Sequence, residues 1–228
     1  MTLNELLKFG IKKLENADIR SAVLDVEILL CEVLKKDRTF IFSNSEFELN
    51  KKQERKFRKL ILYRSKGKPM AYILGHKEFY GLIFKINKNV LIPRPETELL
   101  VEEILGLFQD DRSMQNILEI GTGSGCVAVA LAKNLDVNVL ATDILRKALK
   151  VAKYNARMHG VASRIEFIGS DLFNKNKILK LVQNDKWVLV ANLPYLDVEM
   201  KNLLNFSETR GLKFEPQKAL WAGKDGLE

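Results

Sequence analysis

The chain has 228 residues, of which 46% are apolar and 29% are charged, a composition that excludes an intrinsically disordered protein and allows a sizeable core. No apolar run approaches the roughly 18 residues that span a bilayer. The N-terminal residues lack a signal-peptide layout, so we expect a cytoplasmic protein with no membrane partner. The two cysteines, Cys31 and Cys126, lie far apart in apolar surroundings, which is typical of reduced core thiols, and no Cys/His cluster indicates a metal site.

The net charge of +8 is spread unevenly along the chain. Residues 1–75 carry 16 Lys and Arg against 10 Asp and Glu, whereas residues 76–228 carry 21 against 19. A basic first third is typical of a module that faces an acidic partner such as RNA, a ribosome or an acidic protein. A merely lysine-rich solvated surface explains the same counts equally well.

Residues 1–64 have the apolar spacing of helices and contain no repeat or low-complexity segment. Ser21 is a candidate N-cap for a helix over Ala22–Leu34, and the charged run Lys51–Lys59 begins another helix. That run is either a solvated helix face or a contact with a partner. The pattern predicts a small helical bundle.

Residues 66–69, Lys-Gly-Lys-Pro, interrupt the helical pattern. Residues 71–75 and 78–86 then alternate like paired strands punctuated by glycines, which predicts a hairpin between two domains. The next segment, Ile92–Glu98, places charged residues and a threonine around two prolines and leads into an apolar helix, Leu99–Phe108. Its composition indicates either a segment with a functional role or a segment that only initiates the following helix.

From Asn116 onward strands and helices alternate, which predicts a mostly parallel sheet. The expected strands are 117–120, 137–142, 165–168, 187–191 and 219–222. The expected helices are 126–133 and 145–159.

The first of these strands ends in a glycine-rich turn, Gly121–Gly125, followed by a helix, which is the local arrangement of a nucleotide-binding site. Its Gly-x-Gly-x-Gly spacing differs from the dinucleotide motif, and the chain contains no P-loop. Asp143 and Asp171 end the next two strands, where a carboxylate accepts from ribose hydroxyls or, alternatively, caps a helix. Acidic strand ends without a phosphate-binding lysine suit a cationic ligand with ribose and adenine, such as S-adenosylmethionine.

The strand at 187–191 ends abruptly at the tetrad Asn192, Leu193, Pro194 and Tyr195. The carboxyl ends of parallel strands line the ligand crevice of open α/β sheets, so the tetrad presents an amide and an aromatic ring there. The Asn192 oxygen and the Leu193 carbonyl are suited to accept both hydrogens of a planar NH₂ group. Orienting that nitrogen toward a methyl donor lowers the barrier without a catalytic histidine, and we expect His76 and His159 to be structural or surface residues.

Eight segments carry a resemblance to a known family: Ala71–Gly75, Glu78–Gly81, Leu91–Glu98, Leu118–Gly125, Ser170–Phe173, Asn192–Tyr195, Phe214–Pro216 and Gly223–Leu227. Together they resemble the class I S-adenosylmethionine-dependent methyltransferases and, more closely, the peptide chain release factor N5-glutamine methyltransferase family. The similarity covers nearly the whole chain. The combination of Leu91–Glu98 with the tetrad is highly specific, whereas many methyltransferases share the glycine turn.

The resemblance implies an α/β fold, with a Rossmann-like class I methyltransferase domain preceded by a small helical bundle and a β-hairpin linker. It implies a helical substrate-recognition domain over residues 1–74, a linker over 75–92 and an S-adenosylmethionine-binding domain over 93–228. The family continues through another helix and two more strands beyond the point where this chain stops. We therefore expect a mostly parallel sheet that is truncated on its C-terminal side.

The resemblance also implies roles for individual residues. The cofactor would be bound by Gly121, Thr122, Gly123, Ser124, Gly125, Asp143, Asp171, Leu172 and Asn192. The catalytic and substrate-binding residues would be Asn192, Leu193, Pro194 and Tyr195, with Arg94 and Glu96 also binding substrate. The substrate would be the glutamine of the Gly-Gly-Gln motif in a class I peptide chain release factor, methylated at N5, and neither a metal nor a nucleic acid is required.

Leu193 departs from the family, whose tetrad usually has proline at this position. The Asn-Leu-Pro-Tyr tetrad also resembles that of ribosomal RNA adenine N6-dimethyltransferases, so an adenine-N6 methyltransferase acting on ribosomal RNA or DNA is the alternative. The roughly 110 residues before the glycine turn resemble the release factor family throughout and favour glutamine. A third hypothesis is a truncated, inactive module that binds a release factor.

Overall fold

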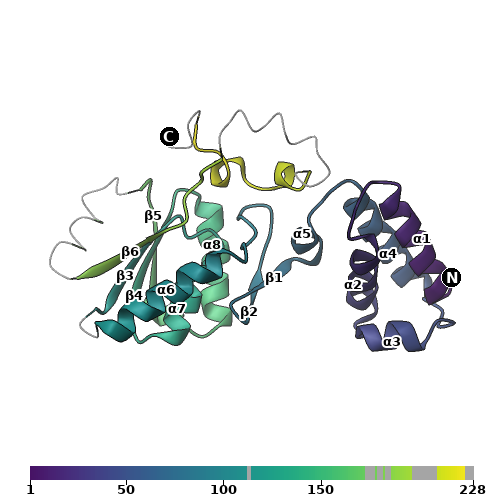
Figure 1. Ribbon diagram of the computed structural model, residues 1–228, viewed down its shortest axis with the longest axis horizontal. Helices are drawn as coiled ribbons and strands as arrows, with labels where there is room; N and C mark the ends of the chain where they lie inside the picture. The colour runs from purple at the N-terminus through teal and green to yellow at the C-terminus, as the bar shows by residue number, and fades with distance from the viewer. Residues whose placement is uncertain (112–113, 173–177, 179–181, 183–185, 197–209, 224–228) are drawn as a thin grey trace. The chain divides into compact units, whose positions relative to one another are not determined.

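The computed structural model describes residues 1–228 except 112–113, 173–177, 179–181, 183–185, 197–209 and 224–228 (Figure 1). The described residues form two compact units. The first contains residues 1–74 and 210–214, and the second contains residues 75–196 and 215–223 apart from these gaps.

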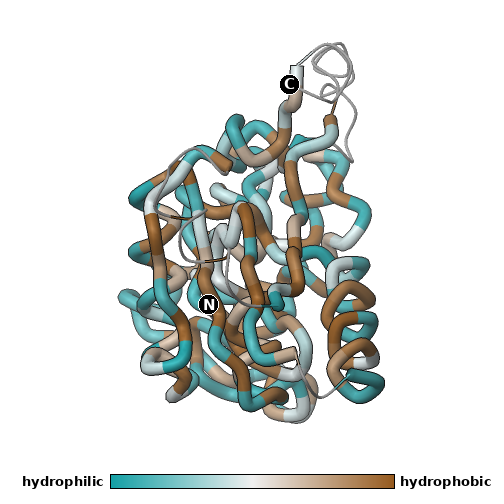
Figure 2. Tube along the Cα trace, turned by 90° about the vertical axis from the view of Figure 1, so that its left-hand side faces the viewer, coloured by the Kyte–Doolittle hydropathy of each residue, from teal (hydrophilic) through white to brown (hydrophobic). Residues whose placement is uncertain are grey.

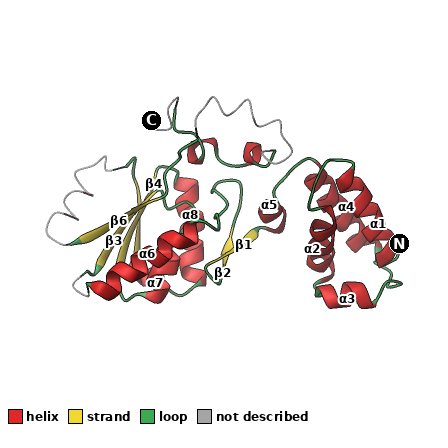
Figure 3. Ribbon diagram, viewed as in Figure 1, coloured by secondary structure: helices red, strands yellow, loops and turns green. Residues whose placement is uncertain are grey.

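The first unit is a bundle of helices, as the apolar spacing predicts (Figure 3). Its helices are α1 (Leu3–Glu15), α2 (Ala22–Leu34), α3 (Arg38–Ser43), α4 (Lys51–Ser65) and α5 (Met70–Leu74). Thr2 and Asn50 precede α1 and α4 and form capping boxes with Glu5 and Gln53. In each box, the side chain of either residue accepts a hydrogen bond from the backbone amide of the other. Ser21 precedes α2 as predicted, but its hydroxyl donates to Asp25 (2.8 Å) and caps no helix amide.

The predicted strand over Ala71–Gly75 is wrong, because most of this segment forms the helix α5. The carbonyl of Pro69 accepts hydrogen bonds from the amides of Tyr72 and Ile73, which closes a helical turn. A five-residue apolar run has too few positions to separate a helical period from a strand period.

The second unit begins with a hairpin whose strands are β1 (His76–Phe79) and β2 (Leu82–Lys85). Its two-residue turn, Tyr80 and Gly81, has φ values of 51° and 70°, which is the left-handed conformation that twisted hairpins favour. The amide of Tyr80 donates to Glu98 (3.0 Å), which ties this turn to a helix that follows in the chain.

The body of the second unit is a parallel sheet with the strand order β5-β4-β3-β6 (Figures 1 and 3). Its strands are β3 (Asn116–Ile120), β4 (Asn138–Asp143), β5 (Ile165–Gly169) and β6 (Trp187–Ala191). The accompanying helices are α6 (Thr97–Asp110), α7 (Cys126–Asn134) and α8 (Arg146–Met158). Figure 2 shows hydrophobic residues interspersed with hydrophilic ones along the trace of the chain. This is a partial Rossmann-like α/β fold, as predicted.

The predicted strand over residues 219–222 is also wrong. Residues Gln217–Ala219 form a short 3₁₀ helix, η4, and the carbonyl of Gln217 accepts from the amides of Leu220 and Trp221. These amides are therefore used locally, and only an isolated parallel bridge joins Trp221 to Leu196. Two further 3₁₀ helices, η1 and η3, cover Ala162–Arg164 and Leu212–Phe214.

Within the described part of the chain, no helix combines the length and the apolar character that crossing a bilayer requires.

Candidate active site

The candidate site lies at the edge of the sheet where the parallel strands end. The chain runs from β3 through β4 to β5 on one side and then returns to β6 on the other side of β3. Ile120 at the end of β3 stands opposite Thr142 in β4 and Ala191 in β6, so the three strand ends are level. A reversal of strand order of this kind opens the crevice in which α/β proteins bind ligands.

The glycine turn follows β3 and leads directly into α7. The amide of Thr122 donates to the carbonyl of Thr142 in the neighbouring strand (2.8 Å), which anchors the turn to the sheet. Gly125 has a φ of 78°, and a Cβ there would lie 3.0 Å from the Cβ of Ala152 in α8. Only glycine therefore fits at this point, where the turn passes close to a helix.

Glu119 is the buried carboxylate beneath this turn. Its side chain accepts a hydrogen bond from the hydroxyl of Thr122 (2.6 Å), and only 5% of the residue is exposed. Burial raises the pKa of Glu119 to about 7, against the hydrogen bonds from Thr122 and the Ala128 amide. The residue is thus able to carry a proton or a charge near neutral pH.

Asp143 ends β4 and holds the glycine turn from the other side. Its two carboxylate oxygens accept from the amide of Gly123 (2.9 Å) and the amide of Leu145 (2.7 Å). Burial raises the pKa of this carboxyl above its ordinary value, although both hydrogen bonds oppose the shift. The alternative role as helix cap does not apply, because α8 begins at Arg146 and Leu145 occupies its N-cap position.

The acidic side chains and the glycine turn at this edge fit S-adenosylmethionine. A carboxylate has about four lone-pair positions, so Asp143 retains capacity for ribose hydroxyls after accepting two amides. Glu119 and Asp143 are both acidic and buried, which suits a cationic ligand. The left-handed glycines at 121, 123 and 125 keep side-chain atoms out of the turn.

Asp171 and Leu172 follow β5, at the far end of the same edge. Both are exposed, and the Leu172 backbone adopts a φ of 46°. The hydroxyl of Ser170 donates to the Leu172 carbonyl (3.0 Å), and the Ser170 amide donates to the Asp143 carbonyl (3.1 Å). Phe173, which belongs to the same family segment, lies outside the described residues.

The tetrad that follows β6 is open to solvent. Exposed fractions are 41% for Leu193 and 73% for Tyr195. The Asn192 side chain donates through Nδ2 to the hydroxyl oxygen of Thr97 (3.1 Å). Among the described residues no hydrogen bond uses its other atom, Oδ1, so this oxygen is available as an acceptor.

The glycine turn and the tetrad lie beside each other across the reversal of strand order. A methyl carbon of Leu193 is 3.5 Å from the position that a Cβ would take at Gly121. The two segments are 72 positions apart in the chain, counting from residue 121 to residue 193, and the sheet brings them together. A ligand on the glycine turn would therefore adjoin a group held by the tetrad.

Arg94 and Glu96 were both expected to contact the substrate. Arg94 is engaged in an ion pair, whereas Glu96 is exposed to solvent. The Arg94 guanidinium donates to Glu215 (2.7 Å), and the Glu215 side chain also accepts from the Ile92 amide (3.1 Å). Arg94 thus fastens the proline-rich segment to a buried carboxylate. Glu96 is exposed at the start of α6 and makes no capping hydrogen bond. A contact of either residue with substrate stays a prediction.

Thr97 and Glu215 are the two residues that sequence reasoning missed. Both belong to segments that carry the family resemblance, but neither was assigned a role. Their partners, Asn192 and Arg94, are 95 and 121 positions away, so no local pattern pairs them. The one signal in the sequence was that both lie in segments that carry the family resemblance.

Covalent catalysis by Cys126 is not supported by its surroundings. Burial raises the pKa of this thiol to about 12, so it remains protonated and unreactive. His159 is also engaged elsewhere, because its Nε2 lies 2.9 Å from the Ile83 carbonyl and its ring packs on Phe84.

Comparison with known proteins gives matches along most of the chain. Residues 5–75 match the PrmC N-terminal domain family, and residues 95–197 match the ribosomal protein L11 methyltransferase (PrmA) family. The release factor glutamine methyltransferase of Leptospira interrogans is 40% identical over 221 residues, which cover 93% of this chain and 76% of that protein.

Two further relatives carry the same name. The protein of Coxiella burnetii is 40% identical over 205 residues, covering 90% of this chain and 69% of its own length. The protein of Buchnera aphidicola is 38% identical over 229 residues, covering 100% of this chain and 78% of its own length. With this identity over nearly all of its length, the chain belongs to the release factor glutamine methyltransferase family of class I S-adenosylmethionine-dependent methyltransferases.

Proposed function

We propose that this chain transfers a methyl group from S-adenosylmethionine to the side-chain N5 of the glutamine in the Gly-Gly-Gln motif of a class I peptide chain release factor. The orientation of Asn192 carries this proposal within the site. Thr97 occupies its Nδ2 and leaves Oδ1 as an acceptor, and the next residue, Leu193, lies against the glycine turn at Gly121. Family membership supplies the substrate class.

The cofactor half of the site consists of residues already named. Backbone atoms of Gly121 through Gly125, with Thr122, Gly123 and Ser124 between them, would hold the methionine part. Asp143 would bind the ribose, and Asp171 with Leu172 would flank the adenine. When bound, the cofactor supplies an electrophilic methyl group on a sulfonium sulfur.

The substrate half must make a poor nucleophile react. The lone pair of a carboxamide nitrogen is delocalised into the carbonyl group. Asn192 Oδ1 and the Leu193 carbonyl would accept its two hydrogens and so fix the direction in which the nitrogen points. This orientation lowers the barrier, and the same acceptors favour the positive charge that develops on nitrogen.

Tyr195 and Pro194 would complete the pocket for the amide. The exposed ring of Tyr195 can pack on the flat carboxamide group, and Pro194 stiffens the turn by fixing its own φ. The proton leaves nitrogen after transfer, when the nitrogen is strongly acidic, so the tetrad needs no strong base.

The remaining parts of the chain would recognise the release factor. We assign this role to the helical domain of residues 1–74, with 75–92 as a linker and 93–228 as the catalytic domain. Arg94 and Glu96 would contribute from the segment that leads into α6. We place the protein in the cytoplasm, where translation termination occurs.

The experiment is a transfer assay with radiolabelled S-adenosylmethionine and two acceptors, a purified class I release factor and ribosomal RNA. We expect label in the release factor, and none in a release factor whose Gly-Gly-Gln glutamine is replaced by alanine. Label in RNA alone would overturn the proposal in favour of adenine-N6 methylation, which the Asn-Leu-Pro-Tyr tetrad also fits. Label in neither would favour an inactive binding module.

A further inference from the structure

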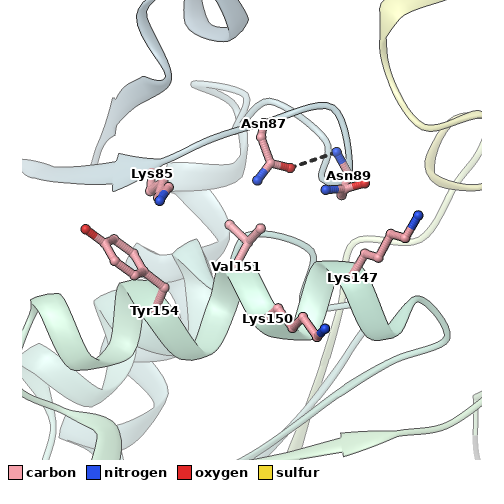
Figure 4. A pocket seen from close by; sticks show the side chains of 7 residues that line it. All are labelled: Lys85, Asn87, Asn89, Lys147, Lys150, Val151 and Tyr154. Carbon is pink, nitrogen blue, oxygen red and sulfur yellow. Dashed lines mark hydrogen bonds between the residues drawn. The ribbon is translucent and has the colours of Figure 1, made fainter.

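A basic groove lies in the second unit, between the segment after β2 and the helix α8 (Figure 4). It has a volume of about 300 Å³. The polar side chains that line it are Lys85, Asn87, Asn89, Lys147, Lys150 and Tyr154. None of them belongs to the proposed methyl-transfer site.

The walls of the groove are held in place by Asn155. Its Oδ1 accepts from the Lys85 amide (2.9 Å), and its Nδ2 donates to the carbonyls of Lys85 (3.1 Å) and Ser124 (2.8 Å). This fully buried amide ties the end of β2 to α8. Across the groove from α8, the backbone amide of Asn89 donates to Asn87 Oδ1 (2.9 Å), as Figure 4 shows. The groove is therefore formed before any ligand arrives.

The groove is positively charged and lacks compensating carboxylates. Lys85, Lys147 and Lys150 are all exposed, and in the described part of the chain no acidic side chain pairs with them. Lys85 Nζ lies 4.3 Å from the centre of the Tyr154 ring, in a cation–π contact within the groove. The sequence of α8 contains five basic residues and no acidic one.

The lining favours a phosphate strand over a segment of protein. Lysine ammonium groups bind phosphate as compact point charges, whereas the planar fork of arginine recognises both carboxylate and phosphate. No arginine lines the groove, and Val151 is its only aliphatic side chain. Tyr154 is the one aromatic side chain of the lining, and Lys85 lies over its ring, so the groove offers an acidic protein segment few of the aromatic and arginine anchors that dominate protein interfaces.

The length of the basic surface favours a strand over a single phosphate. Exposed lysines hold an isolated anion weakly, because water and salt screen each contact. The groove-lining part of α8, from Lys147 to Tyr154, spans about 11 Å, which is longer than a single phosphate and matches neighbouring phosphates of one strand. A ligand that engages several lysines gains by releasing counterions from each phosphate it presents.

We propose that this groove binds the phosphate backbone of an RNA strand, independently of base sequence. The ligand lies across Lys85, Lys147 and Lys150, with the side-chain Nδ2 groups of Asn87 and Asn89 donating to phosphate oxygens. This activity is separate from methyl transfer, so either can fail without the other.

The test measures fluorescence anisotropy of a labelled single-stranded oligouridylate with the full chain, from about 50 to 200 mM salt. Lys150→Glu is compared with Lys153→Glu, an exposed lysine of the same helix that does not line the groove. We expect Lys150→Glu to weaken binding by about threefold to tenfold and to reduce the salt slope by about 1, with a clearly smaller effect for Lys153→Glu. Lys147→Glu combined with Lys150→Glu should weaken binding further.

Several outcomes would overturn the proposal. Equal losses for Lys150→Glu and Lys153→Glu would mean that net charge, not the groove, attracts RNA. Competition by inorganic phosphate as effective as that by the oligonucleotide, at equal phosphate concentration, would reduce the site to a single-anion site. Tighter binding of a polyglutamate peptide would assign the groove to an acidic protein. Thermal melting and methyl transfer to the release factor show whether the variants fold.

Discussion

The two halves of the candidate active site are built in opposite ways. On the cofactor side, Glu119 and Asp143 are 5% and 7% exposed and their carboxylates already accept hydrogen bonds. On the substrate side, Tyr195 is 73% exposed and Asn192 Oδ1 has no partner among the described residues. The half proposed to bind the cofactor is thus preorganised, as binding of a small ligand requires. The half proposed to bind the substrate is open, and a protein segment that docked there would itself exclude water.

The largest effect that separates the two halves is expected from Asn192→Ala. Loss of the Oδ1 acceptor should lower kcat for release factor methylation by about 10²–10³, the cost of removing one preorganised electrostatic partner. Because the buried carboxylates are untouched, the affinity for S-adenosylmethionine, measured by calorimetry, should change little. Equal losses of cofactor affinity and of kcat would show that the halves are not separable.

A substitution at Gly125 should disrupt the cofactor half most directly. Gly125→Ala places a Cβ 3.0 Å from Ala152 and requires an alanine at a φ of 78°. Strain and overpacking together should lower the free energy of unfolding by about 2–4 kcal/mol and weaken cofactor binding. The matched variant is Gly123→Ala, where φ is 55° and the nearest atom is 3.9 Å away. It should cost only about 1–2 kcal/mol in urea unfolding, because strain acts alone. A smaller loss for Gly125→Ala than for Gly123→Ala would contradict this account.

The buried carboxylate Glu119 makes the cofactor half sensitive to pH. Its pKa is about 7 in the folded chain and 4.5 ordinarily, so its contribution to stability is fully present below pH 4.5 and is lost as pH rises through about 7. Glu119→Gln cannot ionise and escapes this loss. The free energy of unfolding of the variant, relative to that of wild type, should therefore rise by on the order of 2 kcal/mol between pH 5 and pH 8.

This gain is measured as the difference in urea unfolding free energy between wild type and variant at each pH. Asp136→Asn, at a fully exposed carboxylate with side-chain exposure of 103%, serves as the matched control and should show no such trend. A difference between wild type and Glu119→Gln that stays constant with pH would mean that Glu119 is not held in a costly environment.

The sequence predicted the elements that depend on local patterns. The glycine turn, the acidic end of β4 and the tetrad after β6 all follow short apolar runs, and strand ends in a parallel sheet must share an edge. The family resemblance then assigned the chemistry. The geometry of this edge was therefore largely predictable, because the glycine turn, Asp143 and the tetrad each stand where a strand ends, whereas their roles toward the cofactor and the substrate stay predictions.

The wrong strand predictions and the missed residues have two causes. Some depend on hydrogen bonds within a single turn, and others depend on contacts between residues far apart in the chain. In α5 and η4, a carbonyl captures amides three or four residues ahead, and this overrides an apolar run that also suits a strand. Glu215 and Thr97 act on partners more than 90 positions away, since 121 and 95 residues separate these pairs. Such pairings exist only once the sheet has formed.

The smallest predicted effect concerns Thr97, the residue that orients the open half. Thr97→Val keeps the shape of the side chain and removes the hydroxyl that accepts from Asn192 Nδ2 (3.1 Å). The amide then loses one hydrogen bond that fixes its Oδ1, so kcat should fall by about 3- to 10-fold, equivalent to about 0.7–1.4 kcal/mol. KM for the release factor and affinity for the cofactor should be unchanged, and Thr97→Ser, which keeps the hydroxyl, should retain most activity. If Thr97→Val raised KM while kcat stayed constant, Thr97 would contact the substrate directly, and the oxygen of Asn192 would owe its orientation to the bound glutamine.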